Sequence, residues 1–184
     1  GSVVNGFESI AGQINAELVK PTIYNRVFVN AYGSLNGRTE LNTHFNTQIS
    51  DKWSTGLYLH ANNRSQKFDR NNDSFLDMPL TNQINIMNRW QYTNLQKGLI
   101  SFLNVRYLKD EKQAGQFSFD PKTDRLSNTV WGSEISTRRF EVSGKFGYVN
   151  PDIPYQSLGL QIAYSDHEQA SYFGLNEYDI RHKS

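Results

Sequence analysis

The sequence predicts an all-β fold, an antiparallel sheet of long strands of the kind that closes into a transmembrane β-barrel. The first observation is a period-two alternation of apolar and polar residues over residues 39–66, which a short turn at Asp51 and Lys52 divides into two halves. Such alternation gives a strand one apolar and one polar face. The second is length, because globular strands have about five or six residues whereas a tilted membrane-spanning strand needs about nine to eleven. The third is a regular order of short and long connections.

The same alternation recurs along the chain and predicts seven strands. They cover residues 22–35, 39–50, 53–66, 81–93, 99–109, 138–149 and a seventh segment that contains Leu158 to Tyr164. Asn36-Gly37 is a dipeptide typical of tight hairpin turns. The polar tail from Asp166 is expected to begin another loop.

The connections predict which end of the sheet carries the loops. Turns near residues 51, 96 and 152 are short, whereas the segments 67–80 and 110–136 are long. Only the turn at Asn36-Gly37 is short on the long-loop side. Outer-membrane barrels have short periplasmic turns and longer extracellular loops.

Bulk composition excludes several classes of protein. Hydrophobic residues make up 37% of the 184 residues and mean hydropathy is −0.65, so the chain contains no apolar run of the length that a membrane helix needs. A barrel stays compatible, because only alternate residues face lipid. The net charge of +1 without a basic cluster makes nucleic acid an unexpected partner. The absence of cysteine excludes disulfides and thiolate sites.

Aromatic residues at the alternate positions that form the apolar face lie near both ends of the expected strands. Those near the short turns are Trp53, Trp90, Tyr92 and Tyr148, and those near the long loops are Tyr107, Phe140 and Tyr164. Rings at both interfaces form the girdles of membrane barrels. The alternative is that they belong to the core of a soluble sandwich.

Residues 1–20 depart from the strand rhythm. Gly6 is followed by the run Ile10-Ala11-Gly12-Gln13-Ile14-Asn15, and Lys20-Pro21 precedes the first long strand. Glycines permit close backbone approach, and Ile14, Ala16 and Leu18 alternate as a short strand would. The segment resembles the end of the plug domain of TonB-dependent outer-membrane receptors, with Gly6, Ile10, Gly12, Ile14 and Asn15 as the matching positions.

The resemblance implies a division of the chain and a set of partners. Residues 1–20 would be the C-terminal end of the plug, and residues 21–184 the N-terminal part of a barrel of about twenty-two strands. The chain would then be a fragment of a larger receptor. Implied partners are outer-membrane lipid and lipopolysaccharide, the TonB energy-coupling complex through the missing N-terminal part, and a small-molecule ligand.

A candidate calcium loop lies in the first long connection. Asp69, Asn71, Asp73 and Asp77 place oxygen ligands at positions one, three, five and nine, as at the start of EF-hand-like loops. Ser74 replaces the usual glycine, and Leu80 stands where a closing glutamate belongs. The resemblance adds that some family members, notably cobalamin receptors, bind calcium in extracellular loops. The alternative is a solvated turn capped by Asp and Asn side chains.

Charged and imidazole side chains lie at the alternate strand positions that form the polar face, which would point into the barrel. His44 and His60 are expected opposite or diagonal to each other, where they either bind a transition metal or hydrogen-bond the plug. The inward cations are Arg26, Arg89, Arg106, Arg139 and Lys145, with Glu141 among them. They either pair with plug carboxylates or guide an anionic substrate through the lumen.

The leading hypothesis is an energised importer of a scarce ligand, most often a metal chelate such as a ferric siderophore, haem or cobalamin. The alternatives are a passive porin-like barrel and a soluble β-sandwich binding module. No residues form a motif such as a nucleophile elbow, so an enzyme is not expected.

Overall fold

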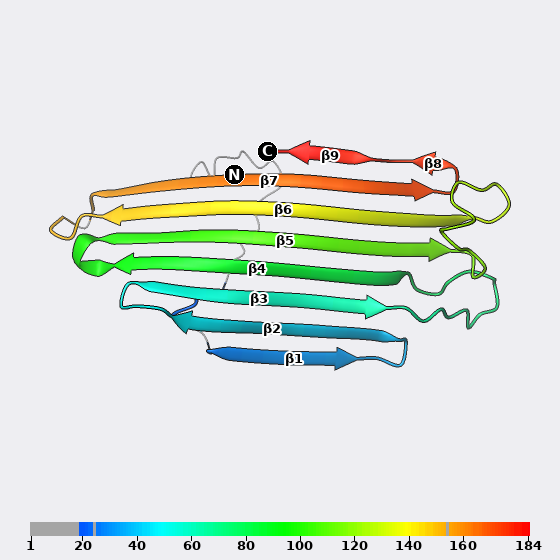
Figure 1. Ribbon diagram of the computed structural model, residues 1–184, viewed down its shortest axis with the longest axis horizontal. Helices are drawn as coiled ribbons and strands as arrows, with labels where there is room; N and C mark the ends of the chain where they lie inside the picture. The colour runs from blue at the N-terminus through cyan, green and yellow to red at the C-terminus, as the bar shows by residue number, and fades with distance from the viewer. Residues whose placement is uncertain (1–18, 24, 154) are drawn as a thin grey trace.

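A single antiparallel sheet makes up the described chain. The computed structural model describes residues 19–23, 25–153 and 155–184. The first eight of its nine strands lie in chain order across the sheet, and the ninth pairs with the seventh, as Figure 1 shows. The strands are β1 (Val27–Gly33), β2 (Arg38–Gln48), β3 (Trp53–Arg64), β4 (Leu80–Asn94), β5 (Leu99–Gly115), β6 (Gly132–Val149), β7 (Ser157–Phe173), β8 (Asn176–Glu177) and β9 (Ile180–Lys183). The all-β, antiparallel prediction is therefore confirmed.

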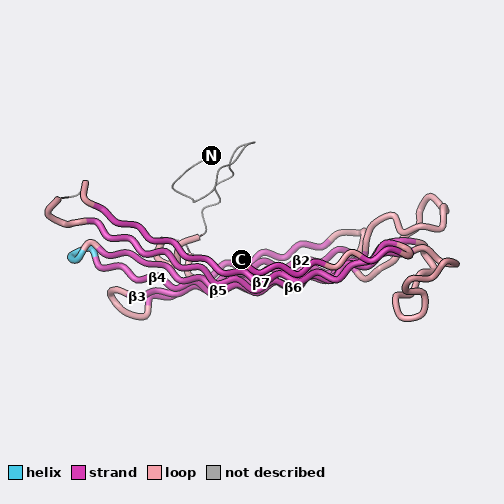
Figure 2. Tube along the Cα trace, turned by 90° about the horizontal axis from the view of Figure 1, so that it is seen from above, coloured by secondary structure: helices cyan, strands magenta, loops and turns pink. Residues whose placement is uncertain are grey.

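The sheet is one curved layer, and it is open at both edges. Figure 2 shows it nearly edge-on, with no second layer drawn over either face by the described residues. Strands β1 to β8 pair with their neighbours in the chain, and β9 also pairs with β7. The described strands do not close on themselves, so the barrel stays a prediction.

The end of the chain differs from the sequence prediction. We expected a loop from Asp166, but β7 continues to Phe173 and the chain returns through a tight turn at Gly174, with φ of 59°. Strands β8 and β9 pair with β7 in one continuous register, Phe173 opposite Asn176 and Asp166 opposite Lys183. They are two parts of an eighth long strand. The prediction was wrong because both faces of β7 are polar there, which removes the alternation.

Short turns lie at one end of the sheet and long loops at the other. Residues 65–79 join β3 to β4, and residues 116–131 join β5 to β6. The β1–β2 turn is short, as expected, with Gly37 at φ of 69°. The β5–β6 loop is shorter than predicted, because β5 and β6 extend by several residues into the segment 110–136.

The turn between β4 and β5 depends on a glycine. A short 3-10 helix, η2 (Leu95–Lys97), begins at Asn94, whose side-chain Oδ1 accepts a hydrogen bond from the backbone N–H of Lys97 at 3.2 Å. Gly98 ends it with φ of 65°, and a Cβ added there would lie 1.7 Å from the backbone oxygen of Val149.

We expect Gly98→Ala to lower the free energy of unfolding by about 1 kcal/mol or more, because it adds left-handed strain to a backbone collision. Gly33→Ala is the control, since nothing lies within 4 Å of the added carbon and φ there is not left-handed. Thermal unfolding in detergent measures both variants. Equal unfolding temperatures for the two would contradict this account of the turn.

One face of the sheet carries an apolar band that no described residue covers. We use this name for the outward residues of alternating parity in seven segments: 27–31, 41–49, 53–61, 84–92, 99–107, 140–148 and 158–164. Leu57 is 49% and Ile162 65% exposed. The expected aromatics lie on this face, and the Trp53 ring contacts those of Trp90 and Tyr92 at centroid distances of 6.5 and 5.0 Å.

The buried apolar contacts of the described residues lie at the long-loop end. Phe119, 1% exposed, packs its ring against Tyr172 of β7 at a centroid distance of 6.5 Å. Lys67 Nζ donates to the carbonyl oxygens of Phe117 and Phe119 at 2.9 and 3.1 Å, which ties the two long loops together. Burial, followed by the charge of Glu134, raises the pKa of Tyr172 to about 12. We call Phe119, Tyr172 and Gly132 the loop core.

Candidate functional site

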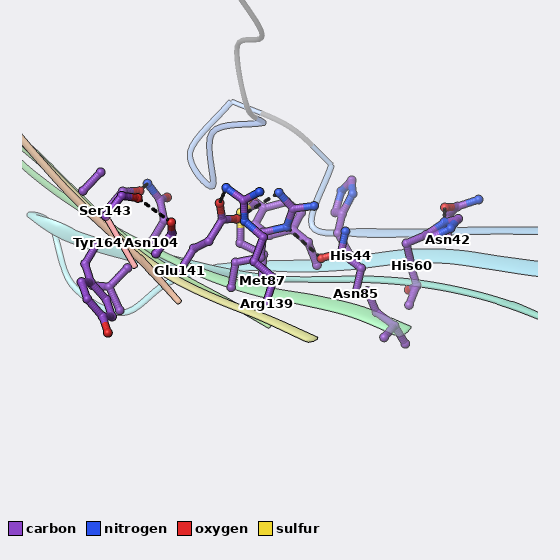
Figure 3. Close-up of a pocket in the computed structure, with 18 of the residues that line it drawn as sticks. Asn42, His44, His60, Asn85, Met87, Asn104, Arg139, Glu141, Ser143 and Tyr164 are labelled. Atoms are coloured by element: carbon purple, nitrogen blue, oxygen red, sulfur yellow. Dashed lines mark hydrogen bonds and ion pairs between the residues drawn. The ribbon is translucent and has the colours of Figure 1, made fainter. Parts of the chain in front are cut away.

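The polar face of the sheet, opposite the apolar band, carries a hollow of about 610 Å³ near its centre. Figure 3 shows side chains that line it, and the lining residues come from strands β1 to β7 together with Ser184. Because successive residues of a strand alternate between faces, polar side chains at every second position of neighbouring strands meet there. Among the predicted lumen residues, His44, His60, Arg106 and Arg139 line this hollow.

An ion triad occupies one side of the hollow. Arg106 Nη1 lies 3.2 Å from Glu141 Oε2, and Arg139 Nη2 lies 2.6 Å from Glu141 Oε1. Arg106 Nε also donates to Asn85 Oδ1 at 3.0 Å. One carboxylate is thus shared by two guanidinium groups, which leaves the triad with a net positive charge.

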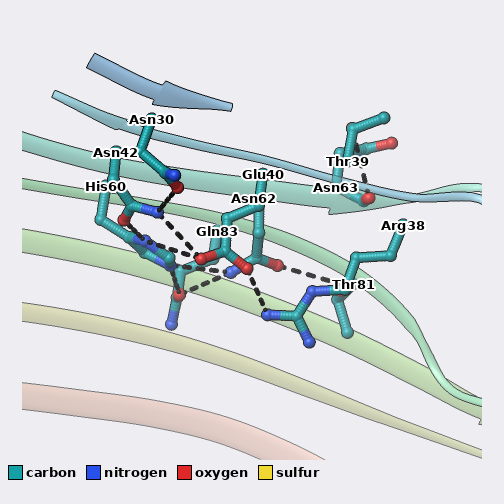
Figure 4. Close-up of polar contacts among 10 residues, drawn as sticks. All are labelled: Asn30, Arg38, Thr39, Glu40, Asn42, His60, Asn62, Asn63, Thr81 and Gln83. Atoms are coloured by element: carbon teal, nitrogen blue, oxygen red, sulfur yellow. Dashed lines mark hydrogen bonds and ion pairs between the residues drawn. The ribbon is translucent and has the colours of Figure 1, made fainter. Parts of the chain in front are cut away.

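The two predicted imidazoles are diagonal neighbours, and their nitrogens are engaged by protein oxygens. His44 is opposite Tyr58, and His60 is opposite Asn42. His44 Nε2 lies 3.0 Å from the backbone oxygen of Asn25. His60 Nδ1 lies 2.6 Å from Asn42 Oδ1, and its Nε2 lies 3.1 Å from Gln83 Oε1, in the network of Figure 4. These partners belong to the sheet and to Asn25 rather than to residues 1–18, so metal ligation and hydrogen bonding to the plug both stay predictions.

The chain before β1 lies against this polar face. The backbone oxygen of Asn25 also accepts a hydrogen bond from Asn46 Nδ2 at 3.0 Å, and the Tyr58 hydroxyl donates to the backbone oxygen of Val19 at 3.3 Å. The plug-like positions Gly6, Ile10, Gly12, Ile14 and Asn15 lie outside the described residues.

The other predicted lumen cations lie away from the hollow. The Arg26 guanidinium lies over the ring of the outward Phe45, 5.9 Å from its centroid, so this side chain reaches round the sheet edge. Arg89 is buried on the polar face with its guanidinium 4.5 Å from the Phe102 ring centroid. Lys145 is exposed and opposite Phe102 in the register.

The candidate calcium loop is organised by its own backbone. Asp69 Oδ1 and Oδ2 accept the N–H groups of Asp73 and Ser74 at 3.1 and 3.0 Å. Asp77 Oδ2 accepts the N–H of Arg70 at 3.2 Å, and Asn71 Nδ2 donates to Asp73 Oδ2 at 2.8 Å. This is the Asx-turn arrangement. Within the described ranges no three His, Cys, Asp or Glu side chains are grouped as a metal site, so calcium binding here stays a prediction.

Two further cations on the polar face were missed from the sequence. Arg38 and Arg64 are opposite each other at the long-loop ends of β2 and β3. They line a second hollow of about 540 Å³. The signal that was available is their equal distance of thirteen positions from Asp51, which places them opposite each other in a hairpin centred on that residue.

No known protein family matches the chain, and no curated protein or solved structure is significantly similar to it. The described residues contain no helix long and apolar enough to cross a membrane.

Proposed function

We propose that the chain forms part of the wall of an outer-membrane β-barrel, in an importer of the TonB-dependent receptor type that carries a scarce ligand such as a metal chelate. The observation that carries the proposal is the contrast between the two faces: an apolar band about five outward residues wide that no described residue covers, and a polar face on the other side. An apolar area of this extent marks an interaction surface. Lipid fits it, because alternate residues of a membrane strand face hydrocarbon.

The limit of the apolar band supports tilted strands. On β2 the apolar band ends at Leu41 on the long-loop side, whereas on β7 it ends at Tyr164, because the charged residues Asp166 and Glu168 take the next two outward positions. Tyr164 lies in the same cross-strand row as Phe45 of β2. The limit thus shifts by four residues, about 14 Å, across five strand spacings of about 4.8 Å. That corresponds to a tilt of roughly 30° between strands and band, near the 35–45° of closed barrels.

Polar side chains inside the band are bonded within the sheet. The Thr43 hydroxyl donates to the backbone oxygen of Phe28 at 2.8 Å, and the Thr55 hydroxyl to that of Arg89 at 3.0 Å. Asn88 Nδ2 donates to the backbone oxygen of Gly56 at 3.1 Å, and its Oδ1 accepts the indole N–H of Trp90. Such internal bonding lowers the cost of placing polar groups in hydrocarbon.

The segment before β1 supports the importer over a passive pore. Val19 and Asn25 bond to Tyr58, His44 and Asn46, so the chain that precedes the sheet meets its polar face. A plug inside a barrel would approach the wall from that face, whereas a porin-like barrel gives no reason for the contact. A soluble sandwich needs a second sheet packed about 10 Å away, and the described residues form one sheet.

The test is energy-dependent uptake in cells that produce or lack the protein. We expect cells without it to lose uptake of at least one labelled ferric siderophore or of cobalamin, and uptake in producing cells to stop when the proton gradient is collapsed. Uptake that survives the collapse would support the passive pore instead. Recovery of the protein in the soluble fraction after membranes are sedimented would contradict both membrane hypotheses.

A further inference from the structure

The second hollow of the polar face places two guanidinium groups together at the rim of the sheet. Arg38 of β2 and Arg64 of β3 are directly opposite in the register. Directly opposed residues on one face have Cβ atoms about 4.5–5.5 Å apart, and like charges in such positions destabilise a sheet. The arrangement therefore calls for a compensating negative charge.

Arg64 has no such charge among the described residues. Its side chain is largely enclosed, with 9% of its surface exposed, and its Nε atom is buried without a hydrogen-bond partner. None of the salt bridges within the described ranges includes it. Because burying an unpaired charge is costly, an anion beside Arg64 would stabilise the fold.

Glu40 also lines this hollow, but its carboxylate is already bonded to two other side chains. Glu40 Oε2 accepts from Arg38 Nη2 at 2.8 Å, and Glu40 Oε1 accepts from Asn42 Nδ2 at 3.0 Å. Figure 4 shows Glu40 held between these two partners. Glu40 thus compensates Arg38, and the hollow keeps the charge of Arg64.

The hollow also offers neutral groups and space. Tyr32, Ser34, Asn36 and Met78 line it with the two arginines, and its volume of about 540 Å³ lies in the range of small-molecule sites. Arg70 Nη2 donates to Asn36 Oδ1 at 2.8 Å. Because its oxygen is occupied, Asn36 presents its amide N–H₂ group as the donor.

The position suits a ligand that arrives from the long-loop side. The hollow lies near the β1–β2 turn, where the sheet is formed by strands of only 7, 11 and 12 residues, whereas β4 to β7 have 15 to 18. Arg38 is six positions along β2 from His44, about 20 Å from the place where residues 19–25 meet the sheet.

We propose that Arg64 and Arg38 form a binding site for an oxyanion, a carboxylate or phosphate group of a diffusible ligand. Planar guanidinium forks bind both anions in bidentate fashion. That this anion belongs to the imported ligand rests on the proposed function, whereas the anion site itself does not. A carboxylate of the same chain has the same chemistry, and Glu8 and Glu17 lie outside the described residues.

The experiment titrates the purified protein in detergent with inorganic phosphate and with citrate, by calorimetry. We expect binding of at least one anion, weakened about tenfold or more by Arg64→Gln, because a charge-assisted contact is lost. Arg64→Lys should recover only part of the affinity, since an ammonium group lacks the planar fork. Lys145→Gln is the matched control, because it removes one exposed cation from the same face, at the other end of the sheet.

Other outcomes overturn the proposal. Equal weakening by Lys145→Gln and Arg64→Gln would show general charge attraction without a site. Anion binding that appears only after Glu8→Gln and Glu17→Gln would assign the hollow to the chain's own carboxylates. Arg38→Gln provides a second variant if Arg64→Gln does not fold. Anion binding by a protein that imports nothing would contradict the proposed function and leave the anion site standing. Import by a protein that binds no anion would contradict the anion site and leave the proposed function standing.

Discussion

Phe119→Ala is expected to open the loop core and release the β5–β6 loop from the sheet. The ring is 1% exposed and packs on Tyr172, while Gly132 leaves the space that it fills, since a Cβ there would lie 2.4 Å from the ring. Truncating a fully buried phenylalanine costs about 3–5 kcal/mol. Because few other apolar groups are buried nearby, we expect the loss to appear as local opening of residues 116–131.

Hydrogen exchange of the backbone amides in residues 116–131 measures this opening. Phe117→Ala is the matched control, because Phe117 belongs to the same loop and its ring is 44% exposed. Both variants keep the backbone oxygens that accept from Lys67. We expect exchange about a hundredfold faster or more in Phe119→Ala, from a loss of about 3 kcal/mol, and little change in the control. Equal exchange in the two variants would show that hydrogen bonds, such as those of Lys67 and that of the Phe117 N–H to Ser74, hold the loop without the Phe119 ring.

The alternation of residues predicted the strands wherever one face is apolar and the other polar. Leu41 to Ile49 and Trp53 to Ala61 show it clearly, and the structure pairs them as expected. Between the band and the long loops both faces are polar, as at Asp166 and His167. The period-two alternation is therefore lost there, although the backbone hydrogen bonds between the strands continue. Strand ends were therefore predicted too short on the long-loop side of β5, β6 and β7.

The alternation placed several charged residues on the polar face, but it missed Arg38 and Arg64 and did not predict the ion pairs. Parity placed Arg106, Arg139 and Glu141 on one face, while their association depends on the register between β5 and β6. The loop core could not be predicted from the sequence, for a related reason. Phe119 lies in a loop without periodicity, and only the tertiary fold brings it to Tyr172.

Arg26 shows the limit of parity at a sheet edge. Its backbone oxygen accepts the N–H of Asn46, which places it at an inward position, yet its guanidinium lies over the outward ring of Phe45. An edge residue has a neighbour on one side only, so a long side chain can turn to either face. Sequence position alone does not determine on which face the side chain of such a residue lies.

Leu57→Arg is expected to prevent stable insertion of the protein into a bilayer. Leu57 lies in the middle row of the apolar band, between Phe45 of β2 and Asn88 of β4, and is 49% exposed. An arginine on the lipid face of a barrel costs about 2–4 kcal/mol at the bilayer midplane and about 0–1 kcal/mol near the interface. Asn63→Arg is the matched control, because Asn63 has the same parity on the same strand but lies beyond the band.

The free energy of unfolding in lipid vesicles distinguishes the membrane hypothesis from the soluble one. If lipid covers the band, Leu57→Arg should lower it by about 2 kcal/mol or more, and Asn63→Arg by less than about 1 kcal/mol. If water covers the band, Leu57 is an ordinary half-exposed surface residue, and both substitutions should stay within about 0.5 kcal/mol of the parent. The difference between the two variants thus reports what covers the apolar band, because strand, face and introduced charge are the same in both.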